Sequence, residues 1–173
     1  MKRRRFVTTV EMWTMTALLS LFACSCAAPA QTYLPPDPLQ GVQTFKATRG
    51  QVWDACVGVL AESGAPIQVV EKESGLITTQ PVIMAEGYGA KPALKGAAYT
   101  PINASPFAIW ESVRYTLSIH VRAVTDSTTI VRITPHVEAF DRNIGRRWYA
   151  CDSNGAIEAK MFVRIGDHLT LGR

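Results

Sequence analysis

The side chains best suited to chemistry in this 173-residue chain are its four cysteines and three histidines. No Gly-x-Ser-x-Gly, P-loop, His-Glu-x-x-His or Gly-x-Gly-x-x-Gly pattern accompanies them. His120 and His136 fall on the outward face of a predicted hairpin, and His168 falls at the end of a predicted helix, where a cation is ordinary. Because these residues supply no nucleophile with a base and an orienting group, we expect no enzymatic activity, metal or cofactor.

The first cysteines follow a segment that is typical of a secretory leader. Residues 2–5 are all basic, and residues 12–23 are uncharged and mostly apolar. This apolar core is shorter than the roughly 20 residues that span a bilayer, and small residues follow it at once. We therefore interpret residues 1–23 as a signal peptide.

The last residues of this leader and the cysteine that follows, Leu21-Phe22-Ala23-Cys24, resemble the lipobox of bacterial lipoproteins. The resemblance implies that the Cys24 thiol receives a diacylglycerol and that palmitate labels the mature protein. Cys26 is the alternative lipidation site, and cleavage after Ala30 would instead release a soluble periplasmic protein. Ser25 is not the acidic residue that retains such lipoproteins at the inner membrane, so the resemblance favours the periplasmic face of the outer membrane.

Charge and composition narrow the range of functions and partners that the protein can have. Four basic residues and one acidic residue give residues 1–23 a net charge of +3, which leaves +1 for the rest of the chain. The mature protein is therefore nearly neutral, and export together with this charge excludes nucleic acid as a partner. Residues 24–43 include several prolines and no apolar period, so we predict a lipid anchor and an extended linker ahead of one domain, residues 44–173.

Two further cysteines, Cys56 and Cys151, belong to that domain. The periplasm is oxidising and permits a disulfide between them. Alternatively, Cys56 lies on an apolar helical face and acts as a small buried hydrophobe. Sequence spacing does not decide between the two, because a disulfide depends on geometry.

The domain begins with a strand near residues 44–47 and a helix. Thr48 and Gln51 form a capping box, apolar residues follow at helical spacing, and Gly64 with Pro66 ends the helix. Residues 66–72 and 76–84 are predicted strands, joined by the turn Glu73-Ser74-Gly75.

A second strand pair and a last helix complete the pattern. Odd-numbered residues are apolar in both 113–124 and 129–140, so an odd-length loop, Thr125-Asp126-Ser127, would place Arg114 opposite Glu138. Residues 152–154 then cap a helix with an apolar stripe. We predict an α+β fold: an antiparallel sheet of about five strands packed by two helices.

Two groups of residues are candidates for partner contact. The insert 85–111 has neither helical nor strand period, and it is interpreted either as a partner-binding lid or as a passive mobile segment. Aromatic side chains in the insert and a basic group after the second hairpin strand are the candidate contacts: Tyr88, Tyr99, Phe107, Trp110, Arg142, Arg146, Arg147 and Trp148.

Residues 49–79 resemble a known unit, with an early Trp in a helix, then Gly64, a strand, Glu-Ser-Gly and the strand start Gly75-Leu76-Ile77-Thr78. The pattern is similar to the helix-grip domain of BamC-type lipoproteins and of small proteobacterial outer-membrane lipoproteins, as is segment 148–158. The resemblance implies a helix-grip-like fold and a non-enzymatic interaction or assembly module with an envelope protein as partner. A periplasmic carrier, holding a small apolar ligand in a helix-grip pocket, is the alternative.

Overall fold

A computed structural model of the protein describes residues 41–171. The described residues belong to one compact unit of the chain. The predicted signal peptide, the lipidation candidates Cys24 and Cys26, and nearly all of the predicted linker lie outside the described residues. Among residues 41–171, no helix has the length and apolar character needed to cross a membrane.

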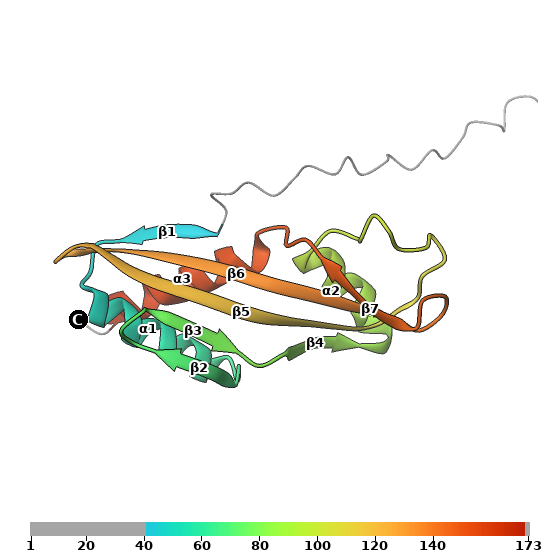
Figure 1. Cartoon of the computed structure of the whole chain (residues 1–173), viewed down its shortest axis with the longest axis horizontal. Helices are drawn as coiled ribbons and strands as arrows, with labels where there is room; N and C mark the ends of the chain where they lie inside the picture. The colour runs from blue at the N-terminus through green and yellow to red at the C-terminus, as the bar shows by residue number, and fades with distance from the viewer. Residues whose placement is uncertain (1–40, 172–173) are drawn as a thin grey trace, which may run out of the picture. The chain divides into compact units, whose positions relative to one another are not determined.

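The fold is α+β, as the sequence predicts, with an open and antiparallel sheet (Figure 1). Residues 41–171 form seven strands, three α-helices and one 3-10 turn, where about five strands and two helices were predicted. In chain order these elements are β1 (Val42–Phe45), α1 (Arg49–Glu62), β2 (Ile67–Glu71), β3 (Leu76–Thr79), β4 (Val82–Glu86), η1 (Gly87–Gly89), α2 (Ala90–Ala97), β5 (Trp110–Thr125), β6 (Thr128–Asp141), β7 (Arg147–Cys151) and α3 (Ala156–Leu171).

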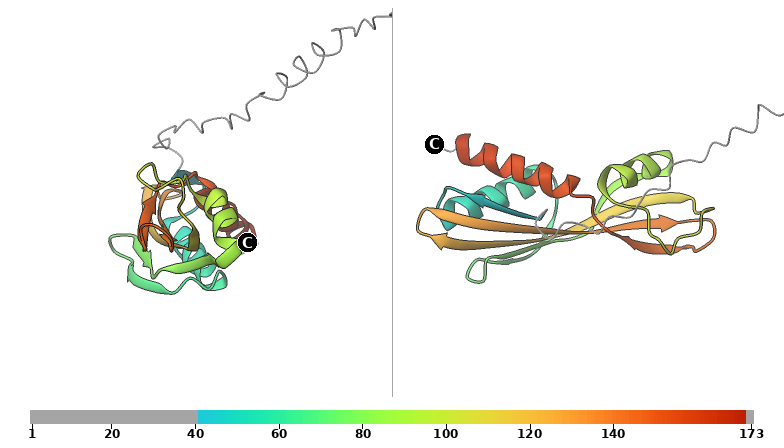
Figure 2. Two further views of the ribbon diagram at one scale, coloured as in Figure 1. Left: turned by 90° about the vertical axis from the view of Figure 1, so that its right-hand side faces the viewer. Right: turned by 90° about the horizontal axis from the view of Figure 1, so that it is seen from above.

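The long hairpin of β5 and β6 is the centre of the sheet. Toward the hairpin turn, β1 pairs with β6, while β3 pairs with β5 and carries β2 at the edge. Toward the other end, β4 pairs with β5 and β7 pairs with β6. The right-hand view of Figure 2 shows the three helices of residues 41–171 on one side of this hairpin, so no helix of the described chain covers the other sheet face.

The hairpin register is the predicted one. Arg114 lies opposite Glu138, and a 2.8 Å ion pair joins their side chains. The inward positions are odd-numbered in both strands and are buried, as at Leu117 and Ile133. The predicted three-residue loop is wrong in detail, because a register shift near Val124 leaves a two-residue turn.

Each half of the hairpin supports its own hydrophobic cluster. The α1–α3 cluster joins these helices to β1, β3 and the nearer parts of β5 and β6, with Val52, Leu60 and Ile165 fully buried. The α2 cluster joins α2 to β4, β7 and the far half of the hairpin, around Leu94 and Val137. The core positions that the sequence predicts in the helices therefore pack against one face of the sheet.

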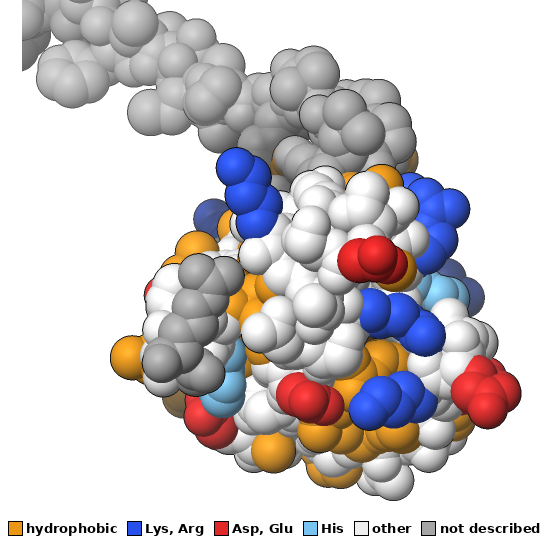
Figure 3. Space-filling model, turned by 90° about the vertical axis from the view of Figure 1, so that its left-hand side faces the viewer, with side chains coloured by type: hydrophobic (Ala, Val, Ile, Leu, Met, Phe, Trp, Pro, Cys, Tyr) orange, Lys and Arg blue, Asp and Glu red, His pale blue; other side chains and the backbone are white. Residues whose placement is uncertain are grey.

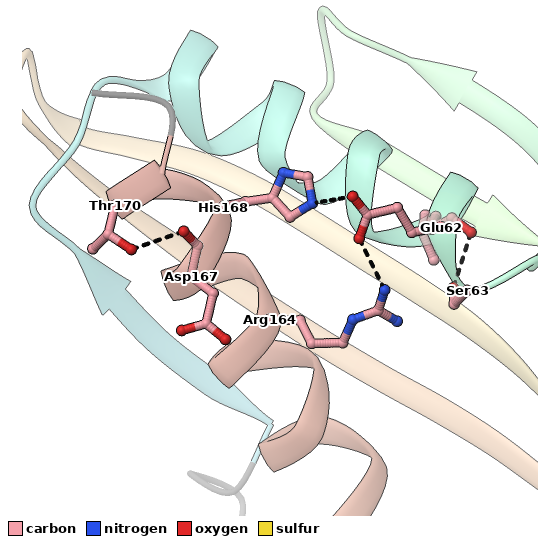
Figure 4. A network of polar contacts seen from close by, with 7 residues as sticks. Glu62, Ser63, Arg164, Asp167, His168 and Thr170 are labelled. Atoms are coloured by element: carbon pink, nitrogen blue, oxygen red, sulfur yellow. Dashed lines mark hydrogen bonds and ion pairs between the residues drawn. The ribbon is translucent and has the colours of Figure 1, made fainter.

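Helix α1 begins and ends as predicted. The Thr48 hydroxyl accepts from the Gln51 N–H, and the Gln51 side-chain oxygen accepts from the Thr48 N–H. Gly64 follows the helix with a φ of 66°, which is typical of a glycine after a C-terminus. Near this end, Glu62 accepts from Arg164 at 3.1 Å and lies 2.9 Å from His168 (Figure 4), so the network joins α1 to α3.

Three predicted segments are corrected by the structure. The strand predicted over 76–84 is two strands, β3 and β4, with a break at Pro81, which has no N–H for a ladder. After β6, Arg142 and Arg146 lie in a turn, and the chain from Arg147 onward forms the edge strand β7. The insert 85–111 contains α2, although it shows no helical period as a whole.

The disulfide that the sequence permits between Cys56 and Cys151 is not formed. Cys56 and Cys151 are both free and buried, and they belong to the two different hydrophobic clusters. Burial raises the pKa of each thiol to about 12, with a smaller opposing effect at Cys151 from a backbone hydrogen bond. Both cysteines are therefore protonated side chains of the core, in keeping with the alternative interpretation of Cys56.

Candidate functional site

Three of the eight residues predicted for partner contact, Tyr88, Trp110 and Arg142, line one hollow at the end of the sheet that α2 covers. Its volume is about 350 Å³. Segments from η1, α2, the start of β5 and the turn after β6 meet there. The lining residues are Gly87, Tyr88, Lys91, Ala108, Ile109, Trp110, Glu111 and Arg142.

One buried carboxylate holds two walls of the hollow together. Asp141, at the end of β6, accepts hydrogen bonds from the N–H groups of Ile109 at 3.0 Å, Asn143 at 2.9 Å and Gly145 at 2.8 Å. Burial alone raises the pKa of Asp141, but these N–H groups together with that of Ile144 outweigh burial and leave the pKa below its usual value. Asp141 is therefore ionised at neutral pH and fixes the 107–109 segment to the turn after β6.

Irregularities in the strands shape the floor of the hollow. The register of β5 against β6 shifts between Trp110 and Ser112, so Glu111 is the extra residue of a bulge. The shift turns Trp110 toward the helix side, where its ring packs edge-on against Tyr149 at 5.8 Å between centroids. The β4 register shifts at the same end of the sheet, between Ile83 and Ala85.

Exposed apolar side chains surround this floor. Tyr88 is fully exposed, Phe107 is 74% exposed and Ile109 is 45% exposed. We call Tyr88, Lys91, Phe107, Ile109 and Arg142 the insert patch. Tyr88 and Ile109 line the hollow and Phe107 is two residues before Ile109, and exposed apolar side chains of this size around a hollow are typical of a binding surface.

The insert patch is positively charged. Arg142 lies 3.7 Å from Glu111, and both side chains are largely exposed, so this ion pair neutralises little of the cation's field. Lys91, on the first turn of α2, forms no ion pair within residues 41–171. The surface therefore combines apolar contact area with two cations and one weakly held carboxylate.

Some predicted contact residues lie elsewhere. Trp110 lines the hollow, but it is only 9% exposed and packs mainly in the α2 cluster. Tyr99 is half-buried and does not line the hollow; its N–H donates to the Asp152 carbonyl, beside the bridge between Ala98 and Ser153.

The basic group splits in the same way. Arg142 lines the hollow, and Arg146 lies exposed in the turn with a φ of 46°. Arg147 and Trp148 belong to β7, where the Arg147 guanidinium lies 4.6 Å from the Tyr149 ring centroid. Trp148 packs on the open sheet face under Arg114, at 3.9 Å from the ring centroid to the guanidinium carbon.

Sequence reasoning missed Lys91, Ile109 and Asp141. The turn signal was present, because Asp141 precedes Asn143 and Gly145 in a pattern that forms side-chain-capped turns. Lys91 could be placed only with α2, which the sequence analysis did not predict. Among residues 41–171, no group of three His, Cys, Asp or Glu side chains is arranged to hold a metal ion.

The solved structures similar to this chain include a distant structural neighbour. No protein-family model matches the chain, and no curated protein matches it. A solved structure of a DUF4468 family protein from Bacteroides ovatus is similar at a TM-score of 0.41 and 9% sequence identity. The similarity covers 74% of this chain and 84% of that chain. At this level of similarity the neighbour does not assign the chain to a family.

Proposed function

We propose that the protein is a non-enzymatic lipoprotein of the bacterial envelope, anchored through Cys24 at the periplasmic face of the outer membrane. Its domain is an interaction module of the BamC-like kind, and an envelope protein docks on the insert patch. The basic leader, the apolar core and the lipobox-like residues before Cys24 support the anchor. Several acyl chains on one terminus give durable attachment, whereas a single short chain binds weakly.

The observation that carries the docking role is the exposure of the insert patch beside a completed core. The α2 cluster is closed by Leu94, Val113 and Val137, none of which is more than 1% exposed. Tyr88 and Phe107 are not needed to fill it, and leaving such rings in water forfeits the free energy that burial would supply. A partner that covers them recovers that free energy.

The charges indicate what kind of partner fits. Lys91 and Arg142 flank the exposed rings, so the partner presents an apolar ridge with carboxylates at its margin. Aromatic and arginine side chains are the residue types that most often dominate protein interfaces. Tyr88, Phe107 and Arg142 are accordingly the expected centre of the interface.

A second candidate function, the carrier of a small apolar ligand, is favoured by the volume of the hollow. About 350 Å³ is near the lower end of ordinary ligand pockets. The ligand would lie in this hollow, because Leu60, Leu117 and Ile165 fill the space between the helices and the sheet. Native mass spectrometry of the protein released from membranes separates the two functions, since a carrier retains an added mass.

Site-specific photo-crosslinking in intact cells tests the docking proposal. A photoreactive residue at position 88 or 107 should capture a discrete envelope protein. Position 163 is the matched control, because Val163 is also an exposed apolar residue, on α3. Equal crosslinking from position 163, or none from 88 and 107, would refute the insert patch as the docking surface.

The anchor is tested separately by metabolic labelling with palmitate. Cys24→Ala should abolish the label and leave Cys26 in place. Persistent labelling in this variant, lost only with Cys26→Ala, would move the anchor to Cys26. No labelling of the unaltered protein would mean that it is soluble in the periplasm.

A further inference from the structure

A second hollow lies on the sheet face that carries no helix, in the half of the hairpin near its turn. It has a volume of about 420 Å³, and its lining within the described chain is Ser74, His120, Val121, Arg122, Ile130 and Arg132. This region belongs to the half of the sheet built on β1 and β3, away from the insert patch. Figure 3 looks onto the end with the hairpin turn and shows basic side chains among exposed hydrophobic ones.

Strand register brings three basic side chains together here. His120 on β5 lies directly opposite Arg132 on β6, and opposed residues of an antiparallel pair share a face. Arg122 is two residues beyond His120, so it shares that face as well. All three side chains are exposed, because the helices cover the other side of the sheet.

The wall of the hollow is a rigid turn. Gly75 approaches β5 so closely that a Cβ atom on it would lie 2.2 Å from the Val121 carbonyl oxygen. The Val121 N–H donates to the Gly75 carbonyl at 2.8 Å, and the Arg49 guanidinium donates to the carbonyls of Lys72 and Glu73. These contacts hold Ser74 beside the basic side chains.

The two arginines form no ion pair within the described chain. Neither Arg122 nor Arg132 forms an ion pair or hydrogen bond with residues 41–171. Glu71 belongs to the same cross-strand row as His120, with Leu76 between them, and its carboxylate accepts from the Ser74 hydroxyl at 2.8 Å. Arg122 and Arg132 are diagonal neighbours on adjacent strands, so their like charges repel, and an anion bound between them relieves the repulsion.

We propose that this hollow is a binding site for a phosphate-type oxyanion, which Arg122 and Arg132 bind with their guanidinium groups and which His120, the neighbour of both, also contacts. Paired guanidinium donors match the geometry of phosphate oxygens. The anion is either free phosphate or the phosphate of a lipid headgroup, since both present the same oxygens. This site is separate from the insert patch, so the proposal does not depend on the docking function.

Nuclear magnetic resonance of the ¹⁵N-labelled full chain tests the site with two probes. One probe is inorganic phosphate, and the other is dihexanoyl phosphatidylglycerol below its micellar concentration. We expect saturable shifts at amides of residues 118–124 and 128–134. Shifts with both probes, or with phosphate alone, assign the site to phosphate as such, and shifts with the lipid alone assign it to a headgroup. Shifts with neither probe would overturn the proposal.

Variants distinguish a site from general attraction to a basic protein. Arg122→Gln and Arg132→Gln should each weaken binding by about tenfold, the amount expected for losing a charge-assisted hydrogen bond. Arg142→Gln and Arg146→Gln remove the same charge at the other end of the sheet and should change the affinity less than twofold. Equal weakening by both pairs of variants would contradict a built site.

Discussion

The substitution Gly75→Ala probes how tightly the turn between β2 and β3 is packed against β5. Gly75 has a φ of 78°, in the left-handed region that an alanine adopts only at a cost of about 1–2 kcal/mol. The added Cβ atom would also lie 2.2 Å from the Val121 carbonyl oxygen, well inside ordinary contact distance. Since that oxygen belongs to the backbone of the central hairpin, the turn has to move instead.

The movement sets the size of the effect. Displacing the turn breaks the 2.8 Å hydrogen bond from the Val121 N–H to the Gly75 carbonyl, which contributes about 0.5–1.5 kcal/mol. Together with the backbone strain, we expect the free energy of unfolding to fall by about 1.5–3.5 kcal/mol. That is a large share of the roughly 5–15 kcal/mol typical of a domain.

Urea unfolding followed by circular dichroism measures the change. Gly50→Ala is the matched control, because Gly50 lies in the first turn of α1 and a Cβ atom there meets nothing within 4 Å. The control should be neutral, or more stable by up to about 1 kcal/mol, because alanine favours a helix over glycine. A Gly75→Ala protein within about 0.5 kcal/mol of the unaltered one, a difference typical of an inconsequential surface change, would refute the close approach.

Three further predictions concern ionisable groups. Backbone N–H groups leave the pKa of Asp141 in the folded protein below its usual value of about 4. The ionised Asp141 therefore stabilises the fold fully above about pH 4, and this stabilisation is lost as the pH falls through the lower pKa of the folded state. Asp141→Asn should remove this acid sensitivity, as followed by unfolding midpoints between pH 2 and 7, and an unchanged profile would contradict it. Cys56 and Cys151 should resist iodoacetamide at pH 8 until urea is added, because burial raises each pKa to about 12; a cross-linked peptide in a non-reduced digest would disprove free thiols. The hydrogen bond from His168 is the main cause that lowers the pKa of Glu62. Glu62→Gln should therefore destabilise the protein slightly at pH 7, where Glu62 is ionised, and should have no effect at a pH below the folded pKa of Glu62. Equal unfolding midpoints of the variant and the unaltered protein at pH 7 and low salt would argue against the network.

The parts of the fold that sequence analysis predicted are those with an uninterrupted period. Alternation over 113–124 and 129–140 specifies which face is buried, and that parity leaves few registers, so the pairing of Arg114 with Glu138 could be derived. The α1 helix was equally accessible, because its capping residues and its apolar spacing agree on where it begins.

The errors arise where a local exception interrupts the period. Pro92 considered alone argues against a helix. In α2, however, it lies in the first turn, where backbone N–H groups make no intrahelical hydrogen bond, so a proline costs none. The bulge at Glu111 reverses the inward face, which is why Trp110 is buried although the alternation from Val113 onward places it outside. The convergence of Tyr88 with Arg142 depends on pairing across β4, β5 and β6, which no local pattern encodes.

The central hairpin also governs how the domain can open. The two hydrophobic clusters share few side chains, and Tyr115 and Ile157 are the partly buried residues that pack against both. Segments that form separate clusters can unfold with separate free energies, so the α2 half can exchange its amide hydrogens without loss of the α1–α3 half. Because Tyr88 and Phe107 lie on the α2 half, a partner that binds there meets a part of the domain whose local stability is set separately from that of the α1–α3 half.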